Sequence, residues 1–230
     1  MKKKAVNHLF LRTLAIIFIL LSCSSERVKN SLTHQNIKGK VKSIEEFSYD
    51  VKEKYGELQR NNLESRSLTN FNEKGQEINR QVFDRDNNEI FHRTFNYNRI
   101  GEIIDCTVIY GDSKNKQMYI YDDSGNIAAF YTYSTAGDTL DESTFKYNEL
   151  GNQIEYSLRD FINRSSTTIR YKYNEVGNII EYSYYDSNGL LFETQSIRYD
   201  KFDEIGNWIL QSSYRDDILR WITEREIKYF

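Results

Sequence analysis

The sequence predicts an all-β fold: a long antiparallel β-meander of about fourteen strands, built from repeated hairpins and curled into an open sheet. Three features of the 230-residue chain indicate this fold. They are a turn motif that occurs six times, apolar and polar residues that alternate between its copies, and the absence of proline. Repetition of one motif at a nearly constant spacing is typical of an array of similar structural units. No capped helix is expected after residue 23.

The repeated motif is an aromatic residue, Asn or Asp, two variable residues, Gly, and a polar residue. Its copies are spaced 26, 24, 26, 26 and 29 residues apart and begin at Phe71, Tyr97, Tyr121, Tyr147, Tyr173 and Phe202. Asn or Asp three residues before Gly is the signature of a type I turn, and the glycine then takes a positive φ in a bulge that rejoins the strand. We therefore expect six hairpin turns, with positive φ at Gly75, Gly101, Gly125, Gly151, Gly177 and Gly206.

A weaker copy of the motif lies halfway along several repeats. Residues 185–189 match it fully, residues 133–137 match it nearly, and in residues 83–87 the glycine position holds Asn87. After glycine, Asn is the residue that best tolerates the left-handed region. The underlying unit is therefore one strand and one turn, mostly 11 to 14 residues long.

Strands are expected throughout the domain. The first covers residues 37–49, a loop surrounds Tyr55 and Gly56, and a more polar strand covers residues 58–69. Later strands alternate with period two, which predicts that Ile180, Tyr182 and Tyr184 share one face. Ordinary composition would supply roughly ten prolines in this length. Their absence favours a meander in which nearly every strand is central, and so many twisted strands must curl or wrap.

The N-terminus has the pattern of an export signal. Residues 1–22 combine a basic beginning with an apolar stretch over residues 14–21, which is too short to span a membrane as a mature helix. The sequence Leu20-Leu21-Ser22-Cys23 resembles a bacterial lipobox, which implies cleavage before Cys23 and lipid attachment to it. The alternative is an ordinary secretory signal with a chance cysteine. Residues 23–36 are polar and are expected to form a flexible tether, followed by a β domain over residues 37–230.

The mature chain is acidic. Removal of the signal leaves 27 basic and 34 acidic residues, a net charge of −7. Nucleic acid is therefore not an expected partner, because its recognition needs basic patches. Likeness to exported lipoproteins implies an anchor in the outer membrane, since Ser24 is not the Asp that marks retention in the inner membrane. Whether the domain faces the periplasm or the cell surface stays open, because only Glu26 follows the cysteine as an acidic export tag.

No motif for catalysis or metal binding occurs in the sequence. Neither His34 nor His92 has a second His or Cys at metal-ligand spacing, so no metal and no cofactor is expected. Cys106 is predicted to be a buried, inert thiol that shares a face with Ile104 and Val108. Glycines recur at repeat spacing rather than in a phosphate loop, and there is no G-x-S-x-G motif. We therefore expect a protein that is not an enzyme.

The repeat unit is similar to the YD repeat of RHS-repeat proteins. The residues that carry the likeness are Tyr97-Asn98…Gly101, Tyr121-Asp122…Gly125-Asn126, Tyr147-Asn148…Gly151-Asn152 and Tyr173-Asn174…Gly177-Asn178. The resemblance covers about residues 71–230 and implies a YD-shell-like arrangement of strands and turns, as in small lipoproteins of Bacteroidetes type. The chain lacks the C-terminal toxin segment of the large family members. It is also expected to be too short for the closed shell that those members build around a cargo.

The aromatic residues are the candidate binding groups. Two rows are expected on one face: Phe95, Tyr119, Phe145, Tyr171 and Tyr199, and the parallel set Tyr97, Tyr121, Tyr147 and Tyr173. Rings on every second strand would lie roughly 10 Å apart, a spacing suited to an extended polymer. The alternative is that these rings only pack against one another in the core.

Three functional hypotheses follow. The first is a non-enzymatic, membrane-anchored repeat protein that presents a curved β surface to a glycan or a protein. The second is a structural, accessory or immunity component of an RHS-like secretion system. The third, an outer-membrane β-barrel, is disfavoured because residues 164–172 have polar side chains on both strand faces and leave no clean lipid-facing side.

Overall fold

The computed structural model describes residues 31–230, so the predicted signal peptide and Cys23 lie outside the described residues. The described chain contains one short helix and fourteen antiparallel strands, which confirms the all-β meander. The elements are α1 Ser31–His34, β1 Val41–Lys54, β2 Glu57–Phe71, β3 Glu77–Asp84, β4 Glu89–Tyr97, β5 Ile103–Tyr110, β6 Ser113–Tyr121, β7 Ile127–Tyr133, β8 Thr139–Tyr147, β9 Gln153–Asp160, β10 Ser165–Tyr173, β11 Ile179–Tyr185, β12 Leu191–Phe202, β13 Trp208–Arg215 and β14 Ile218–Tyr229.

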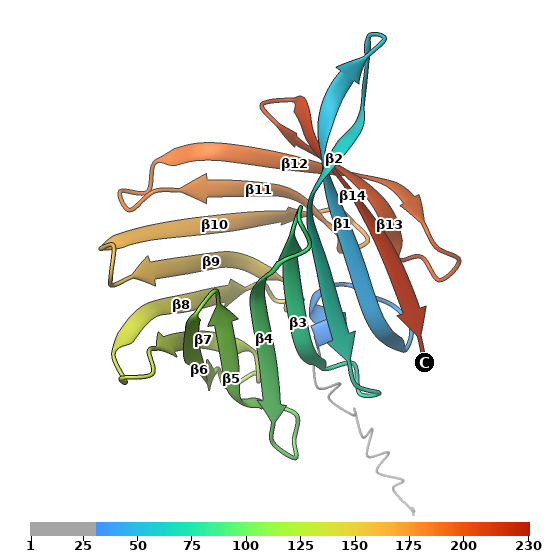
Figure 1. The fold of residues 1–230 in the computed structure, drawn as a ribbon. Coiled ribbons are helices and arrows are strands. Elements are labelled where there is room, and N and C mark those ends of the chain that lie inside the picture. The colour runs from blue at the N-terminus through green and yellow to red at the C-terminus, as the bar shows by residue number, and fades with distance from the viewer. Residues whose placement is uncertain (1–30) are drawn as a thin grey trace, which may run out of the picture.

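The strands close into a barrel, so the expectation of an open sheet is wrong (Figure 1). Every strand pairs with its neighbours in the sequence, and β1 also pairs with β14, over residues 41–50 and 221–229. Right-handed twist accumulates over so many strands and brings the two edges of the sheet together. Pairing these edges satisfies the backbone N–H and C=O groups that an open sheet would leave exposed.

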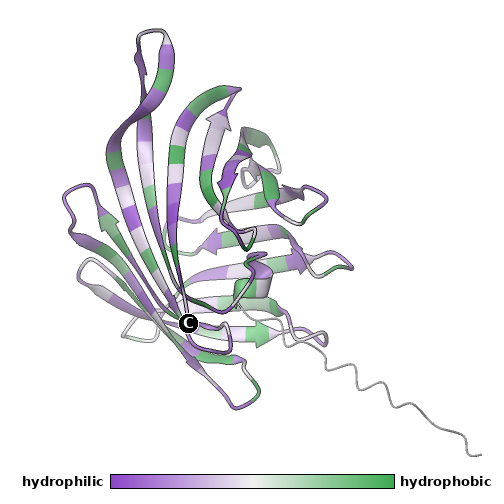
Figure 2. Cartoon of the chain, turned by 90° about the vertical axis from the view of Figure 1, so that its right-hand side faces the viewer, coloured by the Kyte–Doolittle hydropathy of each residue, from purple (hydrophilic) through white to green (hydrophobic). Residues whose placement is uncertain are grey.

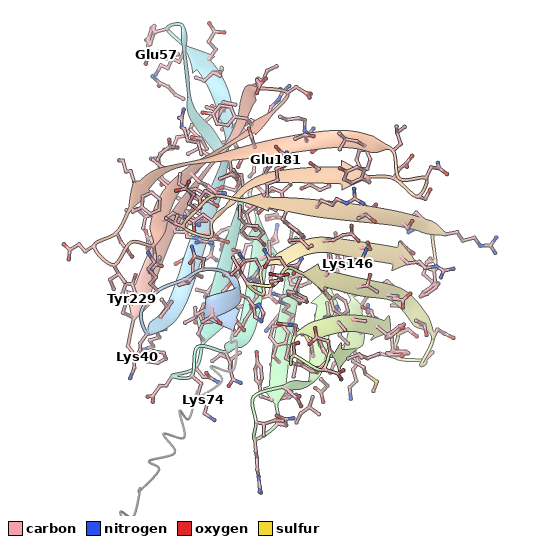
Figure 3. The ribbon with its side chains drawn as sticks, turned by 180° about the vertical axis from the view of Figure 1, so that it is seen from behind. Lys40, Glu57, Lys74, Lys146, Glu181 and Tyr229 are labelled. Carbon is pink, nitrogen blue, oxygen red and sulfur yellow. The ribbon has the colours of Figure 1, made fainter. Side chains whose placement is uncertain are left out.

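Because successive strands run in opposite directions, the turns divide between the two ends of the barrel. All six repeat turns lie at one end, which we call the repeat rim, and the other hairpin turns lie at the opposite rim. Figure 3 shows Lys40, Lys74 and Tyr229 near the repeat rim, whereas Glu57 lies at the far tip of the β1–β2 hairpin. This hairpin projects beyond the other strands in Figure 1, and Tyr55 and Gly56 form its turn.

The repeat turns have the geometry that their sequence predicts. In the first, the backbone N–H of Gly75 donates to the carbonyl oxygen of Asn72 at 2.9 Å, and the N–H of Asn72 donates to the carbonyl oxygen of Gln76 at 2.9 Å. The Asn72 side-chain oxygen accepts from the N–H groups of Lys74 and Gln76. The six repeat glycines have φ between 74° and 98°, the left-handed conformation that closes a type I turn with a bulge.

The bulges beside these turns change which residues face inwards. Tyr97 pairs with Ile103 and Asn96 pairs with Asp105, so Ile104 is an extra residue that points outwards and is 56% exposed. The prediction that Ile104 shares a face with Cys106 is therefore wrong, although Cys106 and Val108 are both buried. An equivalent bulge turns Ile180 outwards, away from the face of Tyr182. Beyond the bulges, polar and apolar residues alternate along most strands (Figure 2).

Residues 31–40 lie across the repeat rim, although residues up to 36 were expected to belong to the tether. Leu32 in α1 is only 4% exposed and belongs to a core cluster with Ile37, Val41, Ile44 and Phe71. The side-chain amide of Asn36 donates to Asn178 Oδ1 at 2.7 Å, and the N–H of Lys38 donates to Asn207 Oδ1 at 2.7 Å. The buried Leu32 and these bonds hold the segment in place, because unpaired polar groups there would be costly.

Candidate binding site in the barrel lumen

An arc of aromatic side chains lines the inner face of the barrel from β4 to β13. Six neighbouring pairs of these rings have centroids 5.3 to 6.4 Å apart. We call this arc the aromatic wall; it consists of Phe95, Tyr119, Phe130, Phe145, Tyr156, Tyr171, Tyr182, Tyr199 and Trp208.

The aromatic wall is denser than the sequence predicts. The expected row used every second strand, but Phe130, Tyr156, Tyr182 and Trp208 fill the strands between, so the expected spacing of roughly 10 Å is wrong. These four residues were missed because they come from the weaker half of each repeat or follow a bulge. Most rings of the wall are half-buried, which leaves part of each ring accessible inside the barrel.

Two cavities lie against this wall. The larger, about 450 Å³, is lined by Tyr171, Tyr182, Tyr199 and Trp208, and the smaller, about 220 Å³, by Phe95, Tyr119, Phe130 and Phe145. His34 and Gln35 of the N-terminal segment and Gln153 of β9 line both cavities, so the segment that closes the repeat rim is also their floor. The larger volume is in the usual range of small-molecule sites.

The second predicted row of tyrosines binds backbone between neighbouring strands. The hydroxyl groups of Tyr97, Tyr147 and Tyr173 donate to the carbonyl oxygens of the residues twenty positions earlier, Glu77, Ile127 and Gln153, at 2.6 to 3.0 Å. Tyr121 instead accepts from the N–H of Ile103 at 2.6 Å. These four tyrosines therefore connect the strand that enters each repeat turn to the strand that leaves the previous one.

Tyr199 belongs to both sets. Its hydroxyl donates to the carbonyl oxygen of Ile179 at 2.7 Å, which is the bond that the second row makes, while its ring packs against Trp208. The last repeat is three residues longer than the one before it, and β12 contains an additional register shift between Tyr199 and Lys201. Phe202, which begins the last copy of the motif, is consequently exposed rather than part of either row.

Charged side chains form the facing part of the inner surface, which we call the ionic wall: Glu46, Glu77, Arg80, Arg93 and Arg225. Arg225 on β14 contacts Glu46 on β1 at 2.7 Å, and its guanidinium lies 3.3 Å from the centre of the Trp208 ring. Arg93 contacts Glu77 at 2.9 Å, and Arg80 lies 3.3 Å from the same carboxylate. No sequence motif marks this cluster: Glu77, Arg80 and Arg93 meet across the β3–β4 hairpin, and Glu46 reaches Arg225 only when β1 and β14 pair.

Burial and ion pairing shift the pKa of several groups in the lumen. Burial alone would raise the pKa of Glu46, but Arg225, together with Arg80 and the hydrogen bond from Ser67, holds that pKa below its ordinary value. Burial raises the pKa of Tyr173 and Tyr199 to about 12 and that of Cys106 to about 11. The lumen therefore offers phenol hydroxyls and ion pairs to a ligand.

Two further findings concern residues 31–230 alone. They contain no group of three or more His, Cys, Asp or Glu side chains arranged to hold a metal ion. None of the helices in this part of the chain has the length and apolar character needed to cross a membrane.

The family model described as Teneurin YD-shell matches residues 9–222 of this chain. The chain belongs to this family. The match supports the YD-repeat likeness of the turn motifs and extends it upstream of residue 71. The strands of this YD-shell protein close into a barrel, and its lumen contains the two cavities described above.

Solved structures similar to this YD-shell chain are distant. A porin-like protein from Bacteroides uniformis is 10% identical, with a TM-score of 0.45 over 82% of this chain and 96% of its own. A putative outer membrane lipoprotein-sorting protein domain from Vibrio parahaemolyticus is 9% identical, with a TM-score of 0.34 over 84% and 88%. The TcdB2–TccC3 structure is 11% identical, with a TM-score of 0.33 over 66% of this chain and 10% of its own. No curated protein matches this chain.

Proposed function

We propose that this YD-shell protein is a non-enzymatic, membrane-anchored binding protein of the cell envelope, and that its lumen binds a segment of glycan. One observation carries the proposal: the aromatic wall lies directly against a cavity of about 450 Å³ that also has polar lining. A core that served packing alone would be filled by its own side chains, as protein interiors are.

The lining of the larger cavity suits both the flat face of a sugar ring and its hydroxyl groups. Tyr171, Tyr182 and Trp208 offer flat surfaces for stacking, as aromatic rings do for other flat ligands. Gln153 and Gln211 offer amide donors and acceptors on the same cavity, which suits hydroxyl groups. A purely apolar ligand would displace water from these amides without replacing its hydrogen bonds, at a cost in binding free energy.

The position of the N-terminal segment suggests how the barrel is oriented relative to the membrane. Residues 31–40 close the repeat rim, and Ser31 enters the fold at that end. A lipid on Cys23 would lie eight residues before Ser31, within about 30 Å of the rim even for a fully extended chain. The repeat rim then faces the membrane, and a glycan enters from the opposite rim by its chain end.

A glycan array probed with the purified mature domain tests the binding. We expect retention of at least one oligosaccharide class, and loss of that binding in Trp208→Ala and Tyr182→Ala. Tyr55→Ala is the matched control, because Tyr55 is 92% exposed at the tip of the β1–β2 hairpin and far from the cavity. Equal binding by all four proteins, or none by the wild type, contradicts a glycan-binding lumen.

Anchoring is tested separately by metabolic labelling with a fatty-acid probe. Two lipid chains or more suffice for stable attachment, where one chain is marginal. Labelling of the wild type and none of Cys23→Ala is the expected result. Equal labelling of both proteins contradicts the lipid anchor. It does not bear on glycan binding in the lumen, which the glycan array tests independently.

The family membership also favours a second candidate, an accessory or immunity component of an RHS-like secretion system. In that case the ligand is a protein, and the exposed residues of the rims matter more than the lumen. Co-purification of a defined partner, abolished by changes at the opposite rim but not by Trp208→Ala, supports this candidate over glycan binding.

A further inference from the structure

The ionic wall is not balanced in charge. Three guanidinium groups, those of Arg80, Arg93 and Arg225, face two carboxylates, those of Glu46 and Glu77. Arg93 places two nitrogens on Glu77 Oε1, at 3.0 and 2.9 Å, and Arg225 donates to Glu46 Oε1 at 2.7 Å. Glu46 is thereby paired with Arg225 and Oε1 of Glu77 with Arg93, so Glu77 Oε2 is the carboxylate oxygen left for Arg80.

Arg80 has the poorest set of partners in this group. Its Nε lies 3.3 Å from Glu77 Oε1, close enough for an ion pair, but the angle does not allow a hydrogen bond, so this buried nitrogen has no hydrogen-bond partner. Its one hydrogen bond to Glu77 is long, 3.3 Å from Nη2 to Oε2. Burial and the nearby Arg93 lower the pKa of Arg80, so its positive charge is held in the fold at a cost.

The side chains of Arg80 and Arg93 lie inside the barrel but remain partly accessible to solvent. Arg80 and Arg93 keep 29% and 28% of their side-chain surface accessible, although both are on the inner face of the barrel. This accessible surface therefore faces the lumen, where a ligand can reach it. Arg93 lines the smaller cavity and Arg225 the larger. Arg80 lines neither cavity, but it lies directly beside Arg93 on the neighbouring strand β3.

We infer that the lumen is selective for an acidic glycan and that Arg80 binds its anionic oxygen atoms, whether these belong to a carboxylate or to a sulfate ester. A guanidinium presents planar, paired donors that match such groups, and a charge-assisted hydrogen bond is about twice as strong as a neutral one. The bound anion neutralises the excess positive charge of the ionic wall. The inference rests on the proposed glycan-binding function and names the ligand class of the same site.

The test is a calorimetric titration of the mature protein with three oligosaccharides of equal length: one neutral, one bearing uronate carboxylates and one bearing sulfate esters. We expect at least one acidic ligand to bind tenfold or more tightly than the neutral one, and the better of the two identifies the anion. Arg80→Gln is expected to remove this preference and Arg80→Lys to retain part of it. Arg85→Gln is the matched control, because Arg85 follows on the same hairpin but its side chain is 61% exposed.

The possible outcomes separate the inference from the proposal beneath it. Tight binding of the neutral ligand with no acidic preference, or a preference unchanged in Arg80→Gln, overturns the inference and leaves glycan binding intact. Binding of none of the three ligands overturns both. If Arg80→Gln does not fold, a salt series on the wild type decides: the Kd of the acidic ligand must rise with ionic strength while that of the neutral one stays constant.

Discussion

Tyr147 at the end of β8 donates its hydroxyl hydrogen to the backbone carbonyl of Ile127 at the start of β7, with 3.0 Å between the two oxygen atoms. Tyr97, Tyr173 and Tyr199 make the same bond to residues twenty positions earlier. The bond lies at the repeat rim, where the backbone ladder ends and each strand turns. The aromatic residue of the repeat therefore has a structural task in addition to lining the lumen.

Removal of one such hydroxyl is expected to weaken the barrel. Tyr173→Phe leaves the ring in place but deprives the Gln153 carbonyl of its 2.6 Å donor, so the free energy of unfolding should fall by about 1 kcal/mol. Urea denaturation followed by far-UV circular dichroism measures the change. Tyr55→Phe, at the exposed hairpin tip, is the control and should be neutral. A Tyr173→Phe midpoint equal to that of the control would show that the bond contributes nothing.

The tyrosines also predict loss of stability in alkaline solution. Burial raises the folded-state pKa of Tyr173 and Tyr199 to about 12, above the value of about 10 in an unfolded chain. The unfolded state therefore loses protons first, so the stabilisation is complete below pH 10 and is lost as the pH rises toward 12. Unfolding midpoints measured from pH 8 upwards should fall above pH 10, less steeply in Tyr173→Phe. A flat profile in the wild type contradicts the burial of these hydroxyls.

Gly125 is expected to be needed for its backbone conformation alone. Gly125 has φ of 77°, and a Cβ placed there would meet no atom within 4 Å, so any cost of substitution arises from strain rather than collision. Gly125→Val should destabilise the protein by at least about 1 kcal/mol, since a β-branched residue is poorly tolerated there. Ser124→Ala in the same turn is the control. Thermal melts that place both variants together would refute the turn assignment.

Asn207 is expected to hold the N-terminal segment on the repeat rim. Its side chain accepts from the N–H of Lys38 at 2.7 Å and donates to the Lys38 carbonyl and to the Tyr229 hydroxyl, both at 2.9 Å. Asn207→Ala removes the side chain that bonds the Lys38 N–H and carbonyl and should cost about 1 to 3 kcal/mol, whereas the Tyr229 hydroxyl keeps its bond to Asp203. Asn152→Ala, at the same position of another repeat, should cost less. Limited proteolysis should then cut residues 31–40 faster in Asn207→Ala than in Asn152→Ala; equal rates would contradict this role.

The sequence by itself determined the local structure. Asx and glycine at fixed spacing allow few turn geometries, so the six repeat turns, the positive φ of Gly75 and its equivalents, and the number of strands follow from short-range sterics. The aromatic rows could also be predicted from the sequence, because side chains alternate between the two faces of a strand. Whether Ile104 and Ile180 face the inside or the outside of the barrel was not predictable. Each is the extra residue of a bulge, which reverses the alternation of side chains between the two faces.

Only the tertiary structure decided the closure of the barrel and the content of its lumen. Pairing of β1 with β14 depends on twist summed over the whole sheet, a quantity that no local motif carries. That pairing brings Glu46 to Arg225 across 179 residues of sequence and sets the ionic wall opposite the aromatic one. It also places residues 31–40 across the repeat rim, because the buried position of Leu32 exists only once the turns have gathered there.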